Sequence, residues 1–403
     1  MAEVARESRA RLLAILASRE RDLHAAEDAL ADAFAQALET WPVEGVPTSP
    51  VAWLLTASRR RLIDGLRRSG SERARLERLA RTIENEVASN LEIEMWPDER
   101  LKLLFIAAHP AVEASARAPL MLQLVFGLDA ATIASAFLAS PSAMSGRLVR
   151  AKNRIRELGI SFDVPESEEL PSRLRSVLDT IYAVFGTAWE PADGTEVRWT
   201  ELRDEAIRLG RLLVELLPGR PEAEGLLALM LHCEARRPAR RDSQGRFVPL
   251  DEQDVALWDL DLIEEAERRL ASAARHRLPG RFQLEAAIQS AHAARRFGRG
   301  VDWADIALFY DELLRIEPTI AAATARAAVI ARIEGPEAGL AALERLPESA
   351  IKDYQPFWAT RAELSRSAGL RREAEAAYDR AIGLSDDPGV RAHLLGRRAR
   401  IVD

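Results

Sequence analysis

The sequence predicts an all-α protein in which two small helical domains are followed by a longer array of helical repeats. Its 403 residues are rich in Ala, Leu, Arg and Glu and contain few β-branched runs, a composition that favours helix. The last third of the chain also has a 34-residue period, which is typical of repeated helical hairpins. A chain of this length exceeds one small core, so we expect two or three domains.

Residues 1–70 predict the first helical domain. An apolar stripe begins at Leu12, and Asp22 can cap the helix that follows. We expect that second helix to end at Trp41-Pro42, because the segment from Trp41 to Pro50 holds three prolines and a glycine and should form a loop. A third helix should then begin near residue 51 and end at about residue 68.

Residues 97–160 predict a second small domain, which contains a helix-turn-helix pattern. The charged and weakly periodic residues 71–96 should form the linker before it. Asp129 can cap the first helix of the pattern, and Ser140 followed by Pro141 suits the start of the second. This last helix should end at about Glu157.

Residues 161–403 predict a C-terminal domain of tetratricopeptide-like repeats. Gly335 and Gly369 are 34 residues apart and suit the turn between two paired helices. Small residues with the same period would let these helices approach closely. An ordered loop is expected at 236–254, inside an earlier irregular copy. The period is marked by Ala294, Ala328 and Ala362, by Ile306, Leu340 and Ala374, and by Tyr310 and Tyr378.

Charge is distributed unevenly along the chain. The formal net charge is −7, yet residues 59–81 hold nine arginines and three acids, and residues 147–156 hold five cations and no acid. Local basic faces of this kind are typical of nucleic-acid binding, whatever the net charge of the whole chain. The absence of a long apolar run and the single cysteine predict a cytoplasmic protein with no membrane span.

The sequence offers no enzymatic site. Its six histidines are scattered without metal-ligand spacing, and no phosphate-binding loop or nucleophile motif occurs. The one cluster of ligand types, His232-Cys233-Glu234, lies beside an apolar run and favours a buried helix over a metal site. We therefore expect no catalytic residue, no metal and no cofactor.

Residues 1–160 resemble a sigma factor of the extracytoplasmic-function (ECF) type, made of sigma regions two and four. The resemblance depends on the block A-E-D-A-L-A-D-A-F from Ala26 and the block P-V-A-W-L-L-T-A-S-R-R-R-L-I-D from Pro50. The whole chain is similar to the subgroup that carries a C-terminal tetratricopeptide extension. The D-S-Q-G-R block from Asp242 is similar to that subgroup's D-G-G-R-type signature, with a different wording.

This resemblance implies two partners, core RNA polymerase and promoter DNA. The acidic residues of region two would contact the polymerase: Glu27, Asp28 and Asp32. Region two would also hold the −10 element through Trp41, Trp53, Arg59, Arg60, Arg61, Arg67 and Arg68, although a tryptophan such as Trp53 is more often a core residue. Region four would contact the −35 element through Ser142, Ser145, Arg147, Arg150, Lys152 and Arg154.

The sequence therefore predicts an alternative sigma factor with a built-in helical-repeat domain. Two other interpretations stay open: a tetratricopeptide scaffold that binds only protein, and a helix-turn-helix regulator that does not replace sigma. The acidic extension could dock on the basic helices, and its repeats could bind a regulatory protein.

Overall fold

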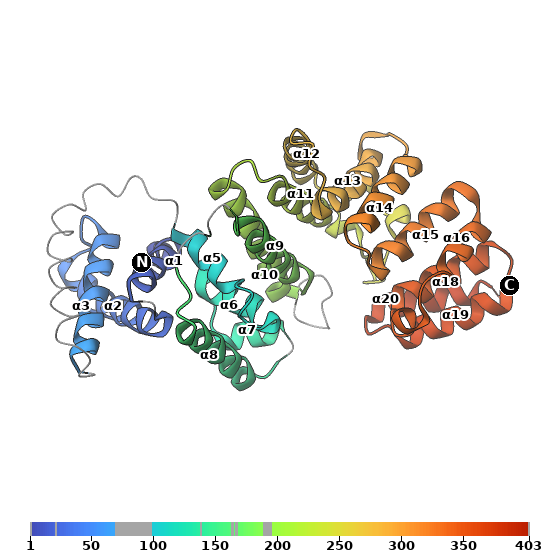
Figure 1. Ribbon diagram of the computed structural model, residues 1–403. Coiled ribbons are helices and arrows are strands. Elements are labelled where there is room, and N and C mark those ends of the chain that lie inside the picture. Colours follow the sequence, from blue (N-terminus) through green and yellow to red (C-terminus); the bar gives the residue numbers. More distant parts are fainter. Residues whose placement is uncertain are drawn as a thin grey trace. The chain divides into compact units, whose positions relative to one another are not determined.

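The computed structural model describes residues 2–20, 22–68, 99–137, 139–162, 165, 168–187 and 196–401, and these residues are almost entirely helical (Figure 1). The all-α prediction is confirmed. Within this part of the chain, the strand-like pairing is limited to an isolated antiparallel bridge between Arg241 and Phe247. The chain forms two compact units. The first comprises Met1–Ala188 and Arg198–Ala206, and the second comprises Trp189–Val197 and Ile207–Asp403.

Helices from both ends of the first unit share one hydrophobic core. Its helices are α1 (Ala2–Glu20), α2 (Leu23–Glu44), α3 (Pro50–Arg68), α5 (Glu99–Ala107), α6 (Ala114–Phe126), α7 (Ala130–Ala136), α8 (Pro141–Glu157), α9 (Leu170–Thr187) and the start of α10 (Glu196–Leu216). Helix α1 packs against α2 and α3 and also against α5 and α6. Leu12 and Leu13 of α1 and Leu103 and Leu104 of α5 are fully buried there. Each such burial contributes roughly 1.5–3 kcal/mol.

The regions predicted as separate domains, 1–70 and 97–160, therefore lie in one compact unit. The predicted linker between them, 71–96, lies outside the described residues. The predicted start of the C-terminal domain at residue 161 also differs from the structure, because α9 packs against α5 and α6 of the first unit. Helix α9 has an apolar face, on which Val177 and Ile181 are fully buried. Packing this face against the first unit is more favourable than leaving it exposed to water.

The expected end of the second helix at Trp41-Pro42 is wrong. Helix α2 continues to Glu44 with Pro42 inside its last turn, and only residues 45–49 form the loop before α3. A proline removes one backbone donor, and in the last turn this loss interrupts little of the helix. The predicted cap at the other end is confirmed, because Asp22 accepts a hydrogen bond from the backbone N–H of His24 at 3.0 Å.

A half-buried arginine joins α1 to the end of α6. Arg9 donates to the backbone carbonyl of Gln123 at 3.1 Å. Gly127, which ends α6 in the left-handed conformation with φ 69°, faces the same side chain, and an added Cβ would lie 2.9 Å from it. Glycine suits this position for both reasons, since it allows the backbone conformation and the close approach of Arg9.

The second unit is a succession of helices in which neighbours along the chain pack together. They are the end of α10 from Ile207, α11 (Pro221–Ala235), α12 (Leu260–Ala274), α13 (Arg281–Ala293), α14 (Trp303–Ile316), α15 (Ile320–Glu334), α16 (Pro336–Leu343), α17 (Glu348–Ile351), α18 (Gln355–Ser367), α19 (Arg371–Gly383) and α20 (Pro388–Ala399). Pairs such as α15 with α16 and α18 with α19 are joined by short turns.

The 34-residue period matches the last two helix pairs and not the first. Gly335 and Gly369 have φ values of 104° and 75°, and each lies between the helices of a pair. Tyr378 is fully buried where α18, α19 and α20 meet, together with Ala362. Ala294 departs from the pattern, because α13 ends one residue earlier and Ala294 begins a short 3-10 helix, η4 (Ala294–Phe297). The tetratricopeptide assignment stays a prediction.

The expected ordered loop between α11 and α12 is confirmed. Asp242 organises it by accepting hydrogen bonds from the backbone N–H groups of Gln244 and Arg246, both at 2.9 Å. Arg241 forms an ion pair with Asp387 at the start of α20. The D-S-Q-G-R block is thus a hydrogen-bonded turn, and the preceding Arg241, which also donates to the carbonyl of Gly245, links it to the start of the last helix of the second unit.

Candidate nucleic-acid interface

Both helices of the predicted helix-turn-helix begin at the expected caps. Asp129 accepts a hydrogen bond from the backbone N–H of Thr132 at 2.8 Å, which holds the pKa of this carboxyl below its usual range. Ser140 accepts from the backbone N–H of Ala143 at 3.2 Å, and Pro141 is the first residue of α8. The two helices, α7 and α8, pack against each other. These local predictions are confirmed.

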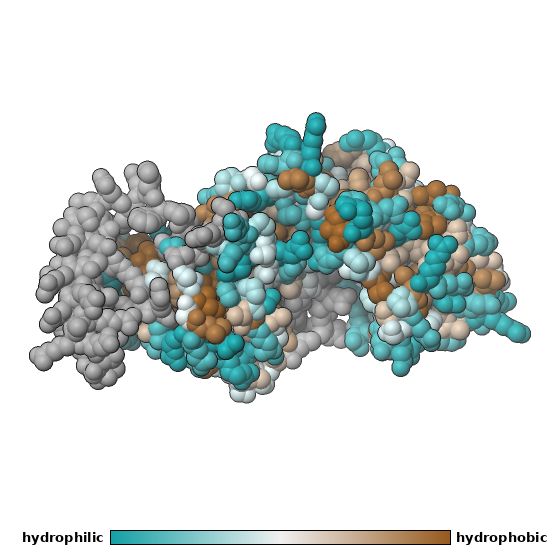
Figure 2. Space-filling model, in the orientation of Figure 1, coloured by the Kyte–Doolittle hydropathy of each residue, from teal (hydrophilic) through white to brown (hydrophobic). Residues whose placement is uncertain are grey.

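Helix α8 is held by one apolar face and presents a polar face outward. Met144, Leu148 and Ile155 are buried against the rest of the unit. Ser142 and Ser145, which the sequence assigns to base recognition, are exposed near the start of the helix. The surface over α8 is largely hydrophilic in the view of Figure 2. A helix fixed in this way can offer its polar face to a partner without unfolding its core.

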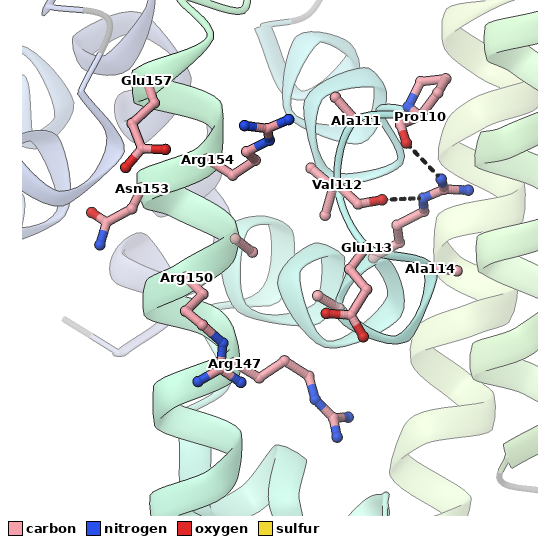
Figure 3. Close-up of a pocket in the computed structure, with 13 residues that line it drawn as sticks. Pro110, Ala111, Val112, Glu113, Ala114, Arg147, Arg150, Asn153, Arg154 and Glu157 are labelled. Carbon is pink, nitrogen blue, oxygen red and sulfur yellow. Dashed lines mark hydrogen bonds between the residues drawn. The ribbon is translucent and has the colours of Figure 1, made fainter.

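A groove of about 590 Å³ lies between α8 and the segment 110–117, which leads into α6. Figure 3 shows Arg147 and Arg154 extending from α8 toward this segment. Arg117 lines the groove from the other side. Two carboxylates, Glu113 and Glu157, also line it, so that four cations, with Arg150, face two anions.

The four arginines of the groove have no ion pair among the described residues. This contrasts with Arg156 of the same helix, which lies 3.4 Å from Asp22. Arg147 donates a hydrogen bond to a backbone carbonyl, that of Ser115, at 3.4 Å. Guanidinium groups without carboxylate partners are suited to bind a further anion, and phosphate matches their forked geometry.

Arg117 is a groove residue that the sequence interpretation missed. Its Nε donates to the carbonyl of Val112 and its Nη2 to the carbonyl of Pro110, both at 3.0 Å; these hydrogen bonds are drawn as dashed lines in Figure 3. A lone arginine before an apolar helical run carries no local signal of function. Only the fold brings it beside α8.

The expected phosphate contact of Lys152 is corrected by the structure. Its side chain is only 6% exposed, and its ammonium group pairs with the carboxylate of Glu27 in α2. Position 152 lies beside Ala151 and Ile155 on the face that packs inward, so its charge requires an internal partner. In this conformation Lys152 cannot reach a phosphate.

The expected polymerase contact of Glu27 changes for the same reason. This carboxylate is 14% exposed and faces two cations, Lys152 and the Arg9 guanidinium at 3.7 Å. Two residues that the sequence assigns to different partners thus bind each other. The remaining acids of the predicted polymerase surface, Asp28 and Asp32, are both exposed, and Asp32 lies 4.0 Å from Arg61 of α3.

The expectation that Trp41 stacks on a base of the −10 element is wrong for this structure. It is 5% exposed and packs edge-to-face on Trp53, with ring centroids 5.4 Å apart and an interplanar angle of 71°. The pair fills the space between α2 and α3, which contact each other closely. Trp53 is half-buried, which agrees with its expected place in the core.

The arginines of α3 differ in exposure. Arg60 and Arg61 are exposed, and Arg59 is half-buried. Arg67 and Arg68 lie in the last turn of α3, where the side chains are outside the described part. The described arginines Arg60 and Arg61 remain consistent with a basic face on α3.

No group of three or more His, Cys, Asp or Glu side chains in the described ranges could hold a metal ion. None of the helices described here has the length and apolar character needed to cross a membrane.

Two parts of the chain match known protein families, and nearly the whole chain is similar to another protein. Residues 4–72 match the family model of sigma-70 region 2, and residues 173–274 match that of a family of unknown function, DUF6596. An uncharacterized protein of Rhizobium meliloti (strain 1021) is 39% identical over 378 residues, which cover 93% of this chain and 89% of the relative. No solved structure matches the chain.

The N-terminal helices α1 to α3 therefore form a sigma-70 region 2, the class of domain that binds RNA polymerase and recognises promoters. The chain belongs to the same family as the Rhizobium meliloti protein, and its N-terminal sigma-70 region 2 is followed by further helices.

Proposed function

We propose that this chain is an alternative sigma factor of the ECF type. Region two, made by α1 to α3, binds core RNA polymerase through the exposed Asp28 and Asp32 and holds the −10 element through the arginines of α3. Helix α8 is the recognition helix for the −35 element. The chain has no catalytic role, and the polymerase supplies the chemistry of RNA synthesis.

The observation that carries this proposal is the row of arginines on α8 without carboxylate partners, on the same chain as the region-two match. A scaffold that binds only protein has no need of a cationic groove beside a capped recognition helix. A regulator that leaves sigma in place has no need of region two. The combination of the two features supports a sigma factor over both alternatives.

The proposal requires the first unit to open. A compact unit of about 200 residues has a radius of gyration of roughly 16 Å. Elements at about −10 and −35 are separated by about 25 base pairs, or roughly 85 Å of duplex. The closed unit cannot span that distance, so α5 to α8 must separate from α1 to α3 when both elements are bound. This step breaks the packing of α1 on α5 and α6 and the pair of Lys152 with Glu27. The second unit would regulate this step or bind a regulatory protein.

Run-off transcription with purified core polymerase tests the proposal. The full chain should direct specific initiation from promoters selected out of a genomic fragment library, and core alone should not. A matched variant, Asp28→Lys with Asp32→Lys, should lose initiation and co-purification with core while its helicity stays unchanged. Duplex binding without any initiation would instead identify a regulator that does not replace sigma. Absence of both activities would identify a scaffold.

A further inference from the structure

We infer that the groove between α8 and residues 110–117 is a binding site, a DNA cradle, for one sugar-phosphate strand of duplex DNA. In this site Arg117 of α6 contacts a phosphate of the DNA backbone. This inference rests on the proposed function, since it concerns how the same chain holds promoter DNA. It adds a second wall to the DNA surface, so that the strand lies between two helices and not on α8 alone.

The spacing of the arginines on α8 favours an extended anion. Arg147, Arg150 and Arg154 are three and four residues apart, so they lie on one face of the helix. At about 1.5 Å per residue the row is roughly 10 Å long. A single phosphate group would engage only part of such a row, whereas a nucleic-acid strand presents successive charges along it.

The opposite wall is pre-organised for the same ligand. Arg117 is oriented by its hydrogen bonds to the carbonyls of Val112 and Pro110, which leave Nη1 without a hydrogen bond among the described residues. Because the backbone fixes this guanidinium, less side-chain entropy is lost when an anion binds. The adjacent Pro110, Ala111 and Val112 give the wall an apolar strip that can contact sugar rings.

The uncharged start of α8 favours DNA over an acidic peptide. Ser142 and Ser145 are exposed on the same helix, within about one and a half turns before the arginine row. Their small side chains let the edges of bases approach the helix while the arginines hold the strand. An acidic peptide would use the arginines and leave the serines without a role. The Glu113 and Glu157 carboxylates offset only part of the charge of the four groove arginines, so the groove keeps a positive excess that a polyanion would neutralise.

Salt dependence of DNA binding tests the inference on the full-length protein. The probe is a fluorescent 24-base-pair duplex of arbitrary sequence, titrated at several salt concentrations between about 50 and 200 mM. Arg117→Gln should reduce the slope of log K against log salt by about 0.9, as should Arg150→Gln. Arg156→Gln, a paired arginine on the same helix, is the matched control and should leave the slope unchanged. A slope for Arg117→Gln equal to that of the unaltered chain overturns the inference.

Arg117→Lys separates loss of charge from loss of folding, because it keeps the cation and removes the fork that binds two carbonyls. Retention of most of the slope supports a phosphate contact. An equal loss in the Lys and Gln variants would assign Arg117 a merely structural role and overturn the inference. A poly-glutamate peptide that binds the protein in an Arg117-dependent way, while DNA binding is independent of Arg117, would identify an acidic protein partner instead.

Run-off transcription distinguishes this inference from the proposed function. A chain that fails to initiate, but shows the Arg117-dependent slope, retains the DNA cradle and loses the sigma assignment. A chain that initiates, but shows no dependence on Arg117, retains the sigma assignment and loses the cradle.

Discussion

Removal of the Lys152 charge should loosen α8 from α2 without altering its contacts with DNA. Lys152→Met keeps the length of the side chain and its apolar contacts, but leaves Glu27 without its main partner. The two groups are 6% and 14% exposed, so the carboxylate cannot be solvated in place. Loss of one member of a buried pair typically costs about 3–5 kcal/mol.

The loss should be smaller here, about 2–3 kcal/mol, because Glu27 also faces Arg9 at 3.7 Å. Arg156→Met is the matched control. The Arg156 side chain, which pairs with Asp22, is about half exposed. Exposed ion pairs of this kind contribute about 0–1 kcal/mol to the free energy of unfolding. The two substitutions lie one helical turn apart and differ chiefly in the burial of the pair that they break.

Hydrogen exchange followed by mass spectrometry measures the effect locally, which suits a chain of two units whose unfolding need not be two-state. A loss of 2–3 kcal/mol should accelerate exchange in α2 and α8 by roughly 30- to 150-fold. The double variant Lys152→Met with Glu27→Gln should recover most of the protection, because no buried charge is left unpaired. Equal exchange in the Lys152 and Arg156 variants would refute the reasoning, as would a reduced salt slope of DNA binding in Lys152→Met.

Three further predictions concern the polymerase surface, the pH dependence of the second unit's stability and the effect of removing the second unit on transcription. Asp28→Lys with Asp32→Lys should reduce association with core polymerase at least tenfold in a pull-down, since both carboxylates are exposed; unchanged association would remove them from the interface. Burial by itself would raise the pKa of Glu363. Hydrogen bonds from Arg397 and Tyr378 outweigh burial, so the pKa is lowered to about 2. Its contribution, at most about 3 kcal/mol, is therefore present above pH 4.5 and lost as the pH falls toward 2. Melting curves of Glu363→Gln should lie below those of the unaltered chain at pH 7 and converge with them near pH 2; a gap independent of pH contradicts this. A chain cut after Ala206 keeps α9 and the start of α10 in the first unit and should differ from the full chain in promoter-directed transcription at equal folded concentration; equal activity would show that the second unit is independent of initiation.

The sequence by itself determined the features that depend on neighbouring residues. The all-α class, the span of α8 and the caps at Asp129 and Ser140 follow from helix propensity and from hydrogen bonds within one turn. The turn glycines Gly335 and Gly369 follow from a backbone conformation that other residues rarely adopt. Such signals are local, so a linear pattern can carry them.

Only the tertiary structure decided which charges remain available to a partner. Lys152 and Glu27 are 125 residues apart, and no pattern in either segment indicates that they pair. Arg117 joins the arginines of α8 because the segment before α6 folds beside that helix, and Trp41 is buried because it meets Trp53 across two helices. A charge near a helix face has the same sequence signature whether it is solvated, paired or poised for a ligand. Its environment depends on long-range packing, which sets burial and the distance to the opposite charge.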